Sequence, residues 1–349
     1  MSSSDQPLTL AFAKGENTLE VRRFCVDEGL SRLFSVSVVA VSPKPDIEFE
    51  TIVGHAASFR LRVADSPTQP IRLWTGVCNH FEMLQPELGA PGAKTVGRST
   101  YFLSIAPNLW LTTQRRSYRI FQQKTIPQLV QQVLDPWGIG GRWELRKERV
   151  DPVSAVGDES YYRKYDYLVQ YGESDFQFIC RLLERAGITF YFRFPGSSEA
   201  ILIFDDAPHA GDIRAGEPIR CFDTPPLKPP QEFISHVAVA HTVQPGSVTL
   251  RDYDIRRPYN YRLLGKSESK VPQPEDFYEQ YCYEPGLSLV DVKKGGSPAT
   301  PTADDKGIFP RHDDMELRWQ AQRPLDILRK HKRHVRYESN CPDLAPGVC

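Results

Sequence analysis

The segment that most constrains the fold is residues 165–194, which reads YDYLVQYGESDFQFICRLLERAGITFYFRF. Apolar residues alternate at its start and again at its end, and a period of two is typical of a β-strand. Between these strands, Ser174 and Gln177 have the spacing of a helix capping box, and Gly187 has the place of the glycine that ends a helix. The segment therefore predicts a strand, a capped helix and a second strand. Their apolar faces are Tyr165, Tyr167, Val169 and Tyr171; Phe178, Ile179, Leu182 and Leu183; and Ile188, Phe190, Phe192 and Phe194.

The sequence before residue 111 is dominated by short β patterns. Clusters of Pro, Gly and Asp separate the candidate strands, and this spacing favours a β-barrel or a β-sandwich. The chain has 29 prolines in 349 residues, which suits short strands and turns better than long helices. The candidate strands are residues 18–23, 33–41, 58–63, 71–81 and 99–105.

A second capped helix precedes the 165–194 segment. Thr125 and Gln128 form another possible capping box after a short strand at 118–122. Pro127 falls in the first turn, where its missing N–H costs little. The two capped helices indicate an α/β segment between the β regions. The apolar stripe of this helix is Ile126, Leu129, Val130, Val133 and Leu134.

After residue 200 the sequence returns to strand patterns and then ends in a helix. Pro324 is expected to kink that helix or divide it in two. The apolar residues of the helix are Met315, Trp319, Leu325 and Leu328; the expected strands are residues 201–204, 233–242 and 247–253; and loops are expected at 146–159 and 287–314.

We therefore expect a mainly β fold with an α/β insert, in three parts. A first β-barrel module takes residues 1–115, and an α/β insert with two capped helices takes 116–200. A second β-barrel module with a C-terminal helix takes 201–349.

The composition excludes several classes of protein. The 43 Lys and Arg residues balance 44 Asp and Glu residues, so no overall field favours nucleic acid or an anionic membrane. Seven dispersed cysteines without a CxxC pair indicate reduced thiols rather than a disulfide framework. The N-terminus does not resemble a secretory signal peptide, and no segment approaches the ~20 apolar residues of a membrane span. We expect the protein to be made in the cytoplasm and exported, if at all, without a cleaved signal.

One dense basic run lies near the C-terminus. A nucleic-acid patch is one interpretation of it. Basic residues also complement the dipole at the C-terminus of a helix, and no aromatic stacking residues are interleaved here, which favours a solvated helix end. The run consists of Lys330, His331, Lys332, Arg333, His334 and Arg336.

Metal and cofactor motifs are weak in this sequence. Structural zinc sites show two closely spaced ligand pairs, whereas Cys341 and Cys349 lie far apart beside His331 and His334. His80 and Glu82 imitate the HxE pair of a deaminase, but no PCxxC follows. The glycine-rich residues 138–141 lack the spacing and the preceding strand of a dinucleotide site. We expect no metal and no cofactor.

Acidic residues are the remaining catalytic candidates. A glycosidase needs two carboxylates about 5–10 Å apart across a cleft, whereas adjacent acids in turns usually contact solvent. Glu173 and Asp175 flank Ser174, and their expected task is to favour the N-terminus of the helix. No nucleophile elbow, phosphate loop or HExxH motif is present. We therefore predict no catalytic residue, although an active site assembled from distant residues stays open. The adjacent pairs are Asp205–Asp206, Asp304–Asp305 and Asp313–Asp314.

The 165–194 segment resembles the signature of the VgrG spike family of bacterial type VI secretion systems, and through it the hubs of contractile phage tails. Three further segments match the same family in order: RLWTGVCNHFEML at 72–84, YFLSIAPNLWLTTQRRSYRIFQQKTIPQLVQQVL at 101–134, and HVRYESNCPDLAPGVC at 334–349. The resemblance extends from about residue 8 to the last residue. Four motifs in order make it specific.

The resemblance implies a structural protein rather than an enzyme. Each chain is expected to carry two similar barrel modules, so that a homotrimer forms a ring with approximate six-fold symmetry. Such a ring adapts the six-fold Hcp tube to a three-fold puncturing spike. The implied partners are the Hcp tube, baseplate subunits and effector proteins. The implied location is the bacterial cytoplasm before firing, and then outside the cell.

The sequence departs from the family pattern because it stops before the small barrel and the β-helical needle. We expect the chain to be a fragment, which alone is a monomer or a weak trimer, and the full-length protein to be a stable trimer. Two alternatives stay open: a cell-wall or polysaccharide hydrolase with scattered carboxylates, and a monomeric effector-adaptor module.

Overall fold

The fold is described from a computed structural model of the chain. The structure describes most of the first 85 residues and all of residues 98–145, and it describes the rest of the chain in shorter stretches. The described residues are 7–62, 71–85, 98–145, 162, 164–194, 200–206, 218–223, 232–253, 263–270, 274–285, 314–342 and 344–347.

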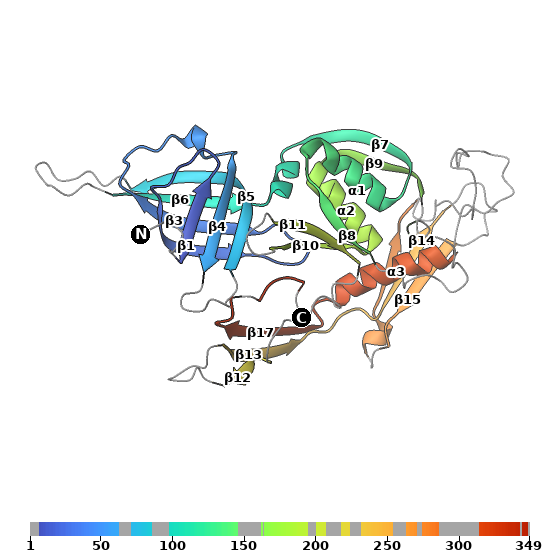
Figure 1. Cartoon of the computed structure of the whole chain (residues 1–349). Helices are drawn as coiled ribbons and strands as arrows, with labels where there is room; N and C mark the ends of the chain where they lie inside the picture. Colours follow the sequence, from blue (N-terminus) through green and yellow to red (C-terminus); the bar gives the residue numbers. More distant parts are fainter. Residues whose placement is uncertain are drawn as a thin grey trace, which may run out of the picture.

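The N-terminal part is a six-stranded antiparallel sheet in the order β1-β4-β5-β6-β3-β2. It curves as a half-barrel (Figure 1). All five strands predicted before residue 111 are present, with ends shifted by a few residues, and β1 was not predicted. The strands are β1 (Leu8–Phe12), β2 (Glu20–Asp27), β3 (Ser35–Ser42), β4 (Ala56–Arg62), β5 (Ile71–Gln85) and β6 (Ser99–Ala106).

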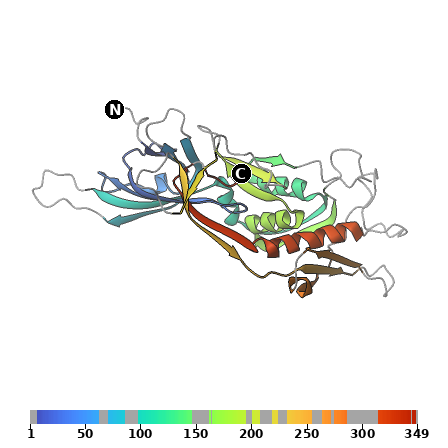
Figure 2. The same ribbon diagram turned by 90° about the horizontal axis from the view of Figure 1, so that it is seen from below.

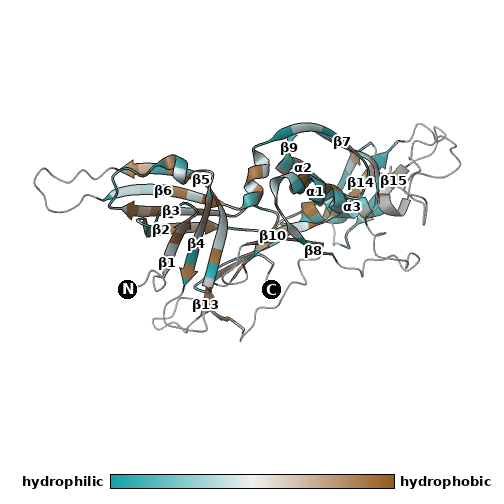
Figure 3. Cartoon of the chain, turned by 45° about the horizontal axis from the view of Figure 1, so that its top comes forward, coloured by the Kyte–Doolittle hydropathy of each residue, from teal (hydrophilic) through white to brown (hydrophobic). Residues whose placement is uncertain are grey.

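Strict alternation sets the register of this sheet. In β3, Val36, Val38 and Ala40 are fully buried while Ser37 and Val39 between them are half-buried. A shift of one residue would turn this apolar set toward the other face, so the pattern fixes the pairing with β6. Figure 3 shows the apolar residues of these strands in brown.

The middle of the chain is an α/β unit with both predicted helices. In α1 the Thr125 hydroxyl accepts from the backbone N–H of Gln128, whose side chain accepts from the N–H of Thr125. Ser174 and Gln177 make the same reciprocal bonds at the start of α2. Both capping boxes are confirmed. The elements are β7 (Arg116–Lys124), α1 (Ile126–Leu134), β8 (Gly141–Glu144), β9 (Tyr165–Ser174), α2 (Asp175–Ala186), β10 (Thr189–Arg193) and β11 (Ile201–Asp205).

The predicted end of α2 is also confirmed. Gly187 has φ +67°, the left-handed conformation that favours glycine. Its N–H returns to the carbonyl of Glu184 at 3.0 Å. This turn directs the chain into β10, where Phe190 and Phe192 are buried as the alternation predicted.

A two-stranded ribbon of β7 and β9 covers helices α1 and α2 on one side (Figure 1). The inward residues Phe121 and Leu168 are buried, and the Phe121 ring stacks on Phe178 of α2 at 5.6 Å. The alternating residues Tyr167 and Tyr171, predicted as one face of the strand, point away from the helices and are exposed.

The last part of the chain forms two three-stranded sheets and a long helix. One sheet has the order β12-β13-β17 and the other the order β15-β14-β16. The strands predicted at 201–204, 233–242 and 247–253 are confirmed; β8, β12, β15 and β16 were not predicted. The elements are β12 (Arg220–Phe222), β13 (Phe233–His241), β14 (Ser247–Asp252), β15 (Leu263–Glu268), β16 (Glu279–Tyr283), α3 (Asp314–Arg329) and β17 (Arg333–Ser339).

Pro324 was predicted to kink the last helix or to divide it in two, and the division does not occur, because α3 is one helix on both sides of this residue. A proline removes only one helical hydrogen bond. Leu317, Ala321 and Leu325 are fully buried and pack with Val248 and Leu250 of β14, so packing holds the helix across the proline. Figure 2 shows α3 in red between the green helices and this sheet.

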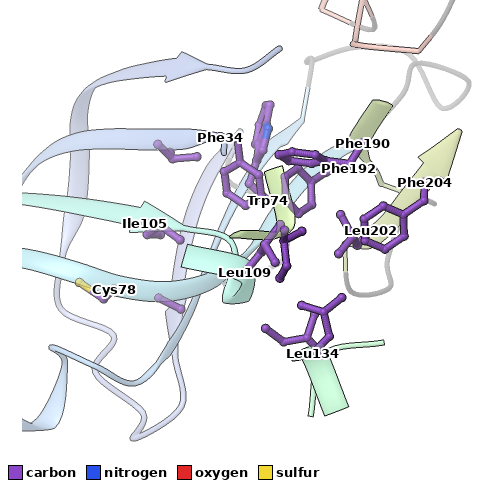
Figure 4. Close-up of a cluster of buried hydrophobic side chains, with 14 of the residues drawn as sticks. Phe34, Trp74, Cys78, Ile105, Leu109, Leu134, Phe190, Phe192, Leu202 and Phe204 are labelled. Carbon is purple, nitrogen blue, oxygen red and sulfur yellow. The ribbon is translucent and has the colours of Figure 1, made fainter. Parts of the chain in front are cut away.

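One large core joins the first sheet to the α/β unit. Phe34 meets Phe192 edge to face, with ring centroids 5.1 Å apart, and Trp74 lies beside them (Figure 4). The small cluster under α3 is separate from this core.

The mainly β fold with its α/β insert is thus confirmed, and one of its sheets is a half-barrel. The module boundaries at 115 and 200, and the second barrel in 201–349, stay predictions. The loop expected at 146–159 lies outside the described residues, as does the one at 287–314 except for Asp314.

Candidate functional site

Asp175, a candidate in the sequence, is the centre of a buried charge network. Its side chain has no exposed area and lies at the first position of α2. Arg115 donates from Nε to Oδ2 at 2.9 Å, and Arg119 bonds Oδ1. The Trp137 indole donates to Oδ2 at 3.0 Å, and the Gln170 amide donates to Oδ1 at 2.9 Å. Both carboxylate oxygens therefore have several donors, as a buried charge requires.

This network joins two of the segments that resemble one family. Arg115 and Arg119 lie in the 101–134 segment, and Asp175 lies in the 165–194 segment. The backbone N–H of Asp175 also donates to the carbonyl of Arg115 at 3.0 Å. The Arg115 guanidinium stacks over the Trp137 ring at 4.7 Å. Asp175 thus ties α2 to β7 as well as lying at the positive end of a helix dipole.

Glu173, its neighbour in the sequence, makes a different ion pair. Its carboxylate accepts from Nε of Arg181 at 3.2 Å and contacts a second nitrogen of the same guanidinium at 2.5 Å. Glu173 and Asp175 are therefore each bound to arginine and have separate tasks. The sequence predicted that both acids favour the helix N-terminus. The structure adds that each acid also holds an arginine side chain in place.

A second network joins the last described segment to the first sheet. Arg72 of β5 donates to both oxygens of Glu28 at 2.7 and 2.9 Å. Its other terminal nitrogen donates to the carbonyls of Pro342 and Leu344, both at 3.3 Å. The Arg72 guanidinium also lies over the Trp74 ring at 4.5 Å.

The Arg72 network joins the other two family-like segments, 72–84 and 334–349. Only 11% of the Arg72 side chain and 16% of the Glu28 side chain are exposed, so the pair is largely desolvated. Gly347 packs so closely that a Cβ there would lie 2.4 Å from the Tyr191 ring. The segment 341–347 is thereby fixed against β5 and β10. No local pattern pointed to Arg72, because its partners are distant along the chain.

The basic run at the end of α3 is split between a buried pair and an exposed strand. Arg329 donates to Oε2 of Glu275 at 3.1 Å, and Lys332 bonds the same oxygen. The Lys332 ammonium, helped by the N–H of Gln244 and by Arg329, holds the pKa of the Glu275 carboxyl below its ordinary value. Of the remaining basic residues, Lys330 and His331 follow α3, Arg333, His334 and Arg336 lie on β17, and all five are exposed. The run is therefore partly an ion-pair site and partly solvated.

The weaker metal candidates are spread over the molecule. His331 follows α3, His334 is exposed on β17, Cys341 is buried, and Cys349 lies outside the described residues. His80 and Glu82 form an exposed contact of 3.4 Å on β5. Across the part of the chain that the structure describes, no three His, Cys, Asp or Glu side chains are grouped to hold a metal ion.

The glycine-rich residues 138–141 have a packing role. Gly138 has φ +64° and ends a short 3-10 helix, η4 (Asp135–Trp137). A Cβ on Gly141 would lie 2.3 Å from the Phe204 ring, so this glycine lets Phe204 pack beneath β8. The Trp143 ring stacks on Phe204 at 4.2 Å.

An open hollow of about 620 Å³ beside α2 is lined by Glu173 and Glu184, together with Arg116 and Arg181. Two less open hollows also bear on catalysis. One, of about 390 Å³, lies between the first sheet and residues 138–140, and its described lining has no carboxylate. The other, of about 340 Å³, lies between α2 and α3 and is lined by Glu184 and Glu284. Three arginines, Arg181, Arg185 and Arg323, line this second hollow as well. Of the acidic pairs, Asp205–Asp206 is buried at the end of β11, and Asp304, Asp305 and Asp313 lie outside the described residues.

Large apolar side chains gather on three strand surfaces. The β7·β9 ribbon exposes Tyr118, Ile120, Tyr167 and Tyr171 on its outer face. The β15-β14-β16 sheet exposes Tyr281 and Tyr283, and the β13·β17 pair exposes Val239 and Tyr337. Exposed apolar patches of this kind mark contact surfaces in proteins. In the described part of the chain, no helix is long and apolar enough to span a membrane.

Comparison with known proteins agrees with this architecture. The family model described as "Phage tail baseplate hub (GPD)" matches residues 27–349. Two spike proteins of Pseudomonas aeruginosa PAO1 are each 30% identical: VgrG1c over 70% of this chain and VgrG1a over 87%. The chain covers 30% and 43% of their respective lengths, so it spans less than half of these relatives.

Solved structures share the fold. A tail protein from Neisseria meningitidis aligns with a TM-score of 0.54 at 11% identity, over 94% of this chain and 78% of its own. The Escherichia coli c3393 protein, a type VI secretion component described as similar to the bacteriophage T4 tail proteins gp27 and gp5, aligns with a TM-score of 0.50 at 22% identity, over 67% of this chain and 56% of its own. The family match begins at residue 27 and includes all four motif segments. The chain therefore belongs to the phage tail baseplate hub family, and VgrG spike proteins are among its relatives.

Proposed function

We propose that the chain forms the base of a type VI secretion spike, where it adapts the six-fold Hcp tube to a three-fold puncturing spike and helps to deliver effectors. The family match over residues 27–349 carries the proposal. The relatives that support it are themselves spike proteins. Baseplate subunits are the further partners that this position requires.

The symmetry argument explains how one chain makes the adaptation. Three chains with two similar β modules each present six modules to a six-fold tube and three ends to a three-fold spike. The half-barrel sheet β1–β6 is the first such module, and residues 201–349 contain the second. The boundaries at 115 and 200 belong to this proposal.

The buried charge networks suit a part that transmits load. A hub between a tube and a spike has to keep its modules fixed while the system contracts. Arg72 ties segment 341–347 to the first sheet, and Asp175 ties α2 to β7. Both carboxylate oxygens of Glu28 and of Asp175 accept hydrogen bonds, so separating either acid from its arginine would leave a largely buried carboxylate unpaired.

The proposed mode of action is structural and needs no catalytic step. The protein acts in the bacterial cytoplasm before firing and then leaves the cell without a cleaved signal. The hydrolase alternative has two described places to act, the hollow with Glu184 and Glu284 and the open hollow with Glu173 and Glu184. A deletion strain that has lost Hcp release can be given either the native gene or a gene with Glu184→Gln and Glu284→Gln. Equal restoration of Hcp release by the two genes would support the structural function.

The test of the proposal is the release of Hcp from the source bacterium. Deleting the gene should remove Hcp from the culture supernatant while Hcp stays in the cells, and the native gene should restore its release. The purified intact protein should also bind preassembled Hcp rings. Normal Hcp release in a deletion strain that has no second spike gene would contradict the proposal.

A further inference from the structure

The β7·β9 ribbon, which curves over α1 and α2, has two free edges because it contains only two strands (Figure 1). On the β9 side, Arg181 of α2 donates to the carbonyl of Val169 at 2.9 Å and covers part of the edge. On the β7 side, no described strand other than β9 pairs with residues 116–124. A free edge presents unpaired backbone N–H and C=O groups, with which a further strand can pair.

The pairing with β9 decides which backbone groups of β7 face this open edge. Opposed residues of antiparallel strands alternate between pairs that exchange two hydrogen bonds and pairs whose N–H and C=O groups point away from each other. Because the Val169 carbonyl meets Arg181, it points away from β7, and the backbone groups of its partner Ile120 likewise point away from β9. Tyr118 and Gln122 have the same phase as Ile120. Outside the ribbon, the backbone groups of these three residues have no hydrogen bond in the described structure.

This stretch of β7 is regular and held from below. The register with β9 shifts between Ser117 and Tyr118, and Gln123 has a φ of +53°, so the strand is regular between these two points. On the inner face of the stretch, Arg119 bonds the buried carboxylate of Asp175. A strand that is fixed before binding loses little conformational freedom when a partner adds to it.

The side chains beside the open edge are apolar and exposed. Tyr118 is 72% exposed and Ile120 is 70% exposed. The Tyr118 ring packs edge to face on Tyr171 of β9, with centroids 5.2 Å apart. Side chains directly opposite one another on paired strands are in contact, so an added strand would place its own side chains against Tyr118 and Ile120. In strand addition the backbone hydrogen bonds give affinity and the alternate side chains give specificity.

Charge argues against a second copy of β7 as the added strand. The strand, RSYRIFQQK, carries three cations and no carboxylate. If Ile120 lay opposite itself in two antiparallel copies, Arg116 would lie opposite Lys124, and like charges at opposed positions are destabilising. A carboxylate at either position would be favourable instead. Of the two acids of β9, Glu173 already has an arginine partner and Asp166 lies past the regular stretch.

We propose that β7 is a docking edge, at which an extended segment of a different protein adds as the third strand of the ribbon. Tyr118, Ile120 and Gln122 supply the backbone hydrogen bonds. The segment carries apolar side chains at alternate positions, opposite Tyr118 and Ile120, and a carboxylate opposite Arg116 or Lys124. This inference goes beyond the proposed hub function and does not depend on it.

The experiment selects binders from a phage-displayed library of random twelve-residue peptides on the native protein. Ile120→Pro removes the outward N–H but no hydrogen bond to β9, so the fold should persist, which thermal unfolding checks. The selected peptides should bind Ile120→Pro about ten-fold more weakly than the native protein, or worse, because a backbone hydrogen bond and its donor are lost. Ile120→Val keeps both the N–H and the branched side chain, and its affinity should stay within about two-fold of the native value.

Two further measurements distinguish strand addition from other modes of binding. When single amides of a selected peptide are methylated, affinity should fall at every second position, because only alternate amides of an added strand face β7. In hydrogen exchange, the amides of Tyr118, Ile120 and Gln122 should exchange freely in the protein alone. The same amides should become protected when the peptide is bound.

Several results would overturn the docking edge. One is the absence of any peptide that distinguishes the native protein from Ile120→Pro, and another is an effect of methylation without a period of two. Amides that are already protected in the protein alone also overturn it. Protection that disappears on dilution would assign the edge to a second copy, and protection that stays would assign it to another part of this chain. None of these measurements involves Hcp, so their failure leaves the hub function standing.

Discussion

Arg72 on β5 binds both carboxylate oxygens of Glu28, at 2.7 and 2.9 Å, across 44 residues of sequence. The same guanidinium donates to the carbonyls of Pro342 and Leu344. One side chain therefore joins the start of the first sheet, its middle and the last described segment. Arg72 therefore fixes the position of Pro342 and Leu344 against the first sheet.

Replacing Arg72 with leucine should destabilise the protein by about 3 kcal/mol, because Glu28 would stay largely buried without its cation. Urea unfolding measures the loss. Limited proteolysis should cut earlier near residue 342 in the variant. Arg60→Leu, at an exposed site on the neighbouring strand β4, is the matched control and should change stability by less than about 0.5 kcal/mol. Equal effects of the two substitutions would contradict the role given to Arg72.

Replacing Asp175 with asparagine should cost about 1–3 kcal/mol, because an amide NH2 would face N–H donors in place of a carboxylate oxygen that has no exposed area. Glu173→Gln is the control from the same helix start. Its partner Arg181 is 46% exposed, so this change should cost less than about 1 kcal/mol. Chemical unfolding of both variants decides between a structural network and a simple dipole effect, since a dipole effect alone would make their costs similar.

The Glu275 ion pairs should make stability depend on acid pH. The Lys332 ammonium lowers the pKa of this carboxyl below 4.5 in the folded state. The resulting stabilisation is complete above the unfolded pKa and is lost as the pH falls through the lowered value. The stability difference between the native protein and Glu275→Gln should therefore be largest near neutral pH and shrink in acid. In a Lys332→Met background this pH dependence should weaken, and an unchanged profile would refute the pairing.

Two thiols, of the buried Cys78 and the half-buried Cys180, should resist alkylation in the folded protein. Burial raises the pKa of Cys78 to about 11 and that of Cys180 to about 12, so neither forms a thiolate near pH 8. Iodoacetamide followed by mass spectrometry should modify Cys25, Cys221 and Cys282 first. Cys78 and Cys180 should react only after unfolding; rapid labelling of either one in the native state would count against this packing.

Gly76 should not tolerate a side chain. A Cβ there would lie 1.9 Å from the carbonyl oxygen of Ala106 on the paired strand, so backbone would have to move. Gly76→Ala should lower the free energy of unfolding by about 1–3 kcal/mol, the usual range for overpacking. Gly140→Ala, where a Cβ meets nothing within 4 Å, should be neutral. Thermal unfolding of the two alanine variants gives the comparison.

Local features of this fold could be read from the sequence, and distant ones could not. The capping boxes at Thr125 and Ser174 and the glycine at 187 depend on residues within a few positions, and all are present. The alternation in β3 likewise determined its buried face. By contrast, the partners of Arg72 lie 270 and 272 residues away, so no window of sequence contains them.

Two further differences have physical reasons. The alternation at Tyr167 and Tyr171 correctly predicted a strand, but alternation does not say whether an aromatic face meets the core or another molecule. Pro324 was expected to kink its helix or divide it in two. The helix is not divided, because Leu317 and Ala321 before the proline and Leu325 after it form one buried stripe. Tertiary packing outweighed the local penalty there.

The most direct test of the central claim is electron microscopy of the intact protein, with its mass measured by light scattering. The proposed hub function predicts a trimer whose averages show a three-fold ring with six similar β modules around its axis. A monomer, or an assembly with two-fold symmetry, would contradict the proposal that this chain adapts a six-fold tube to a three-fold spike.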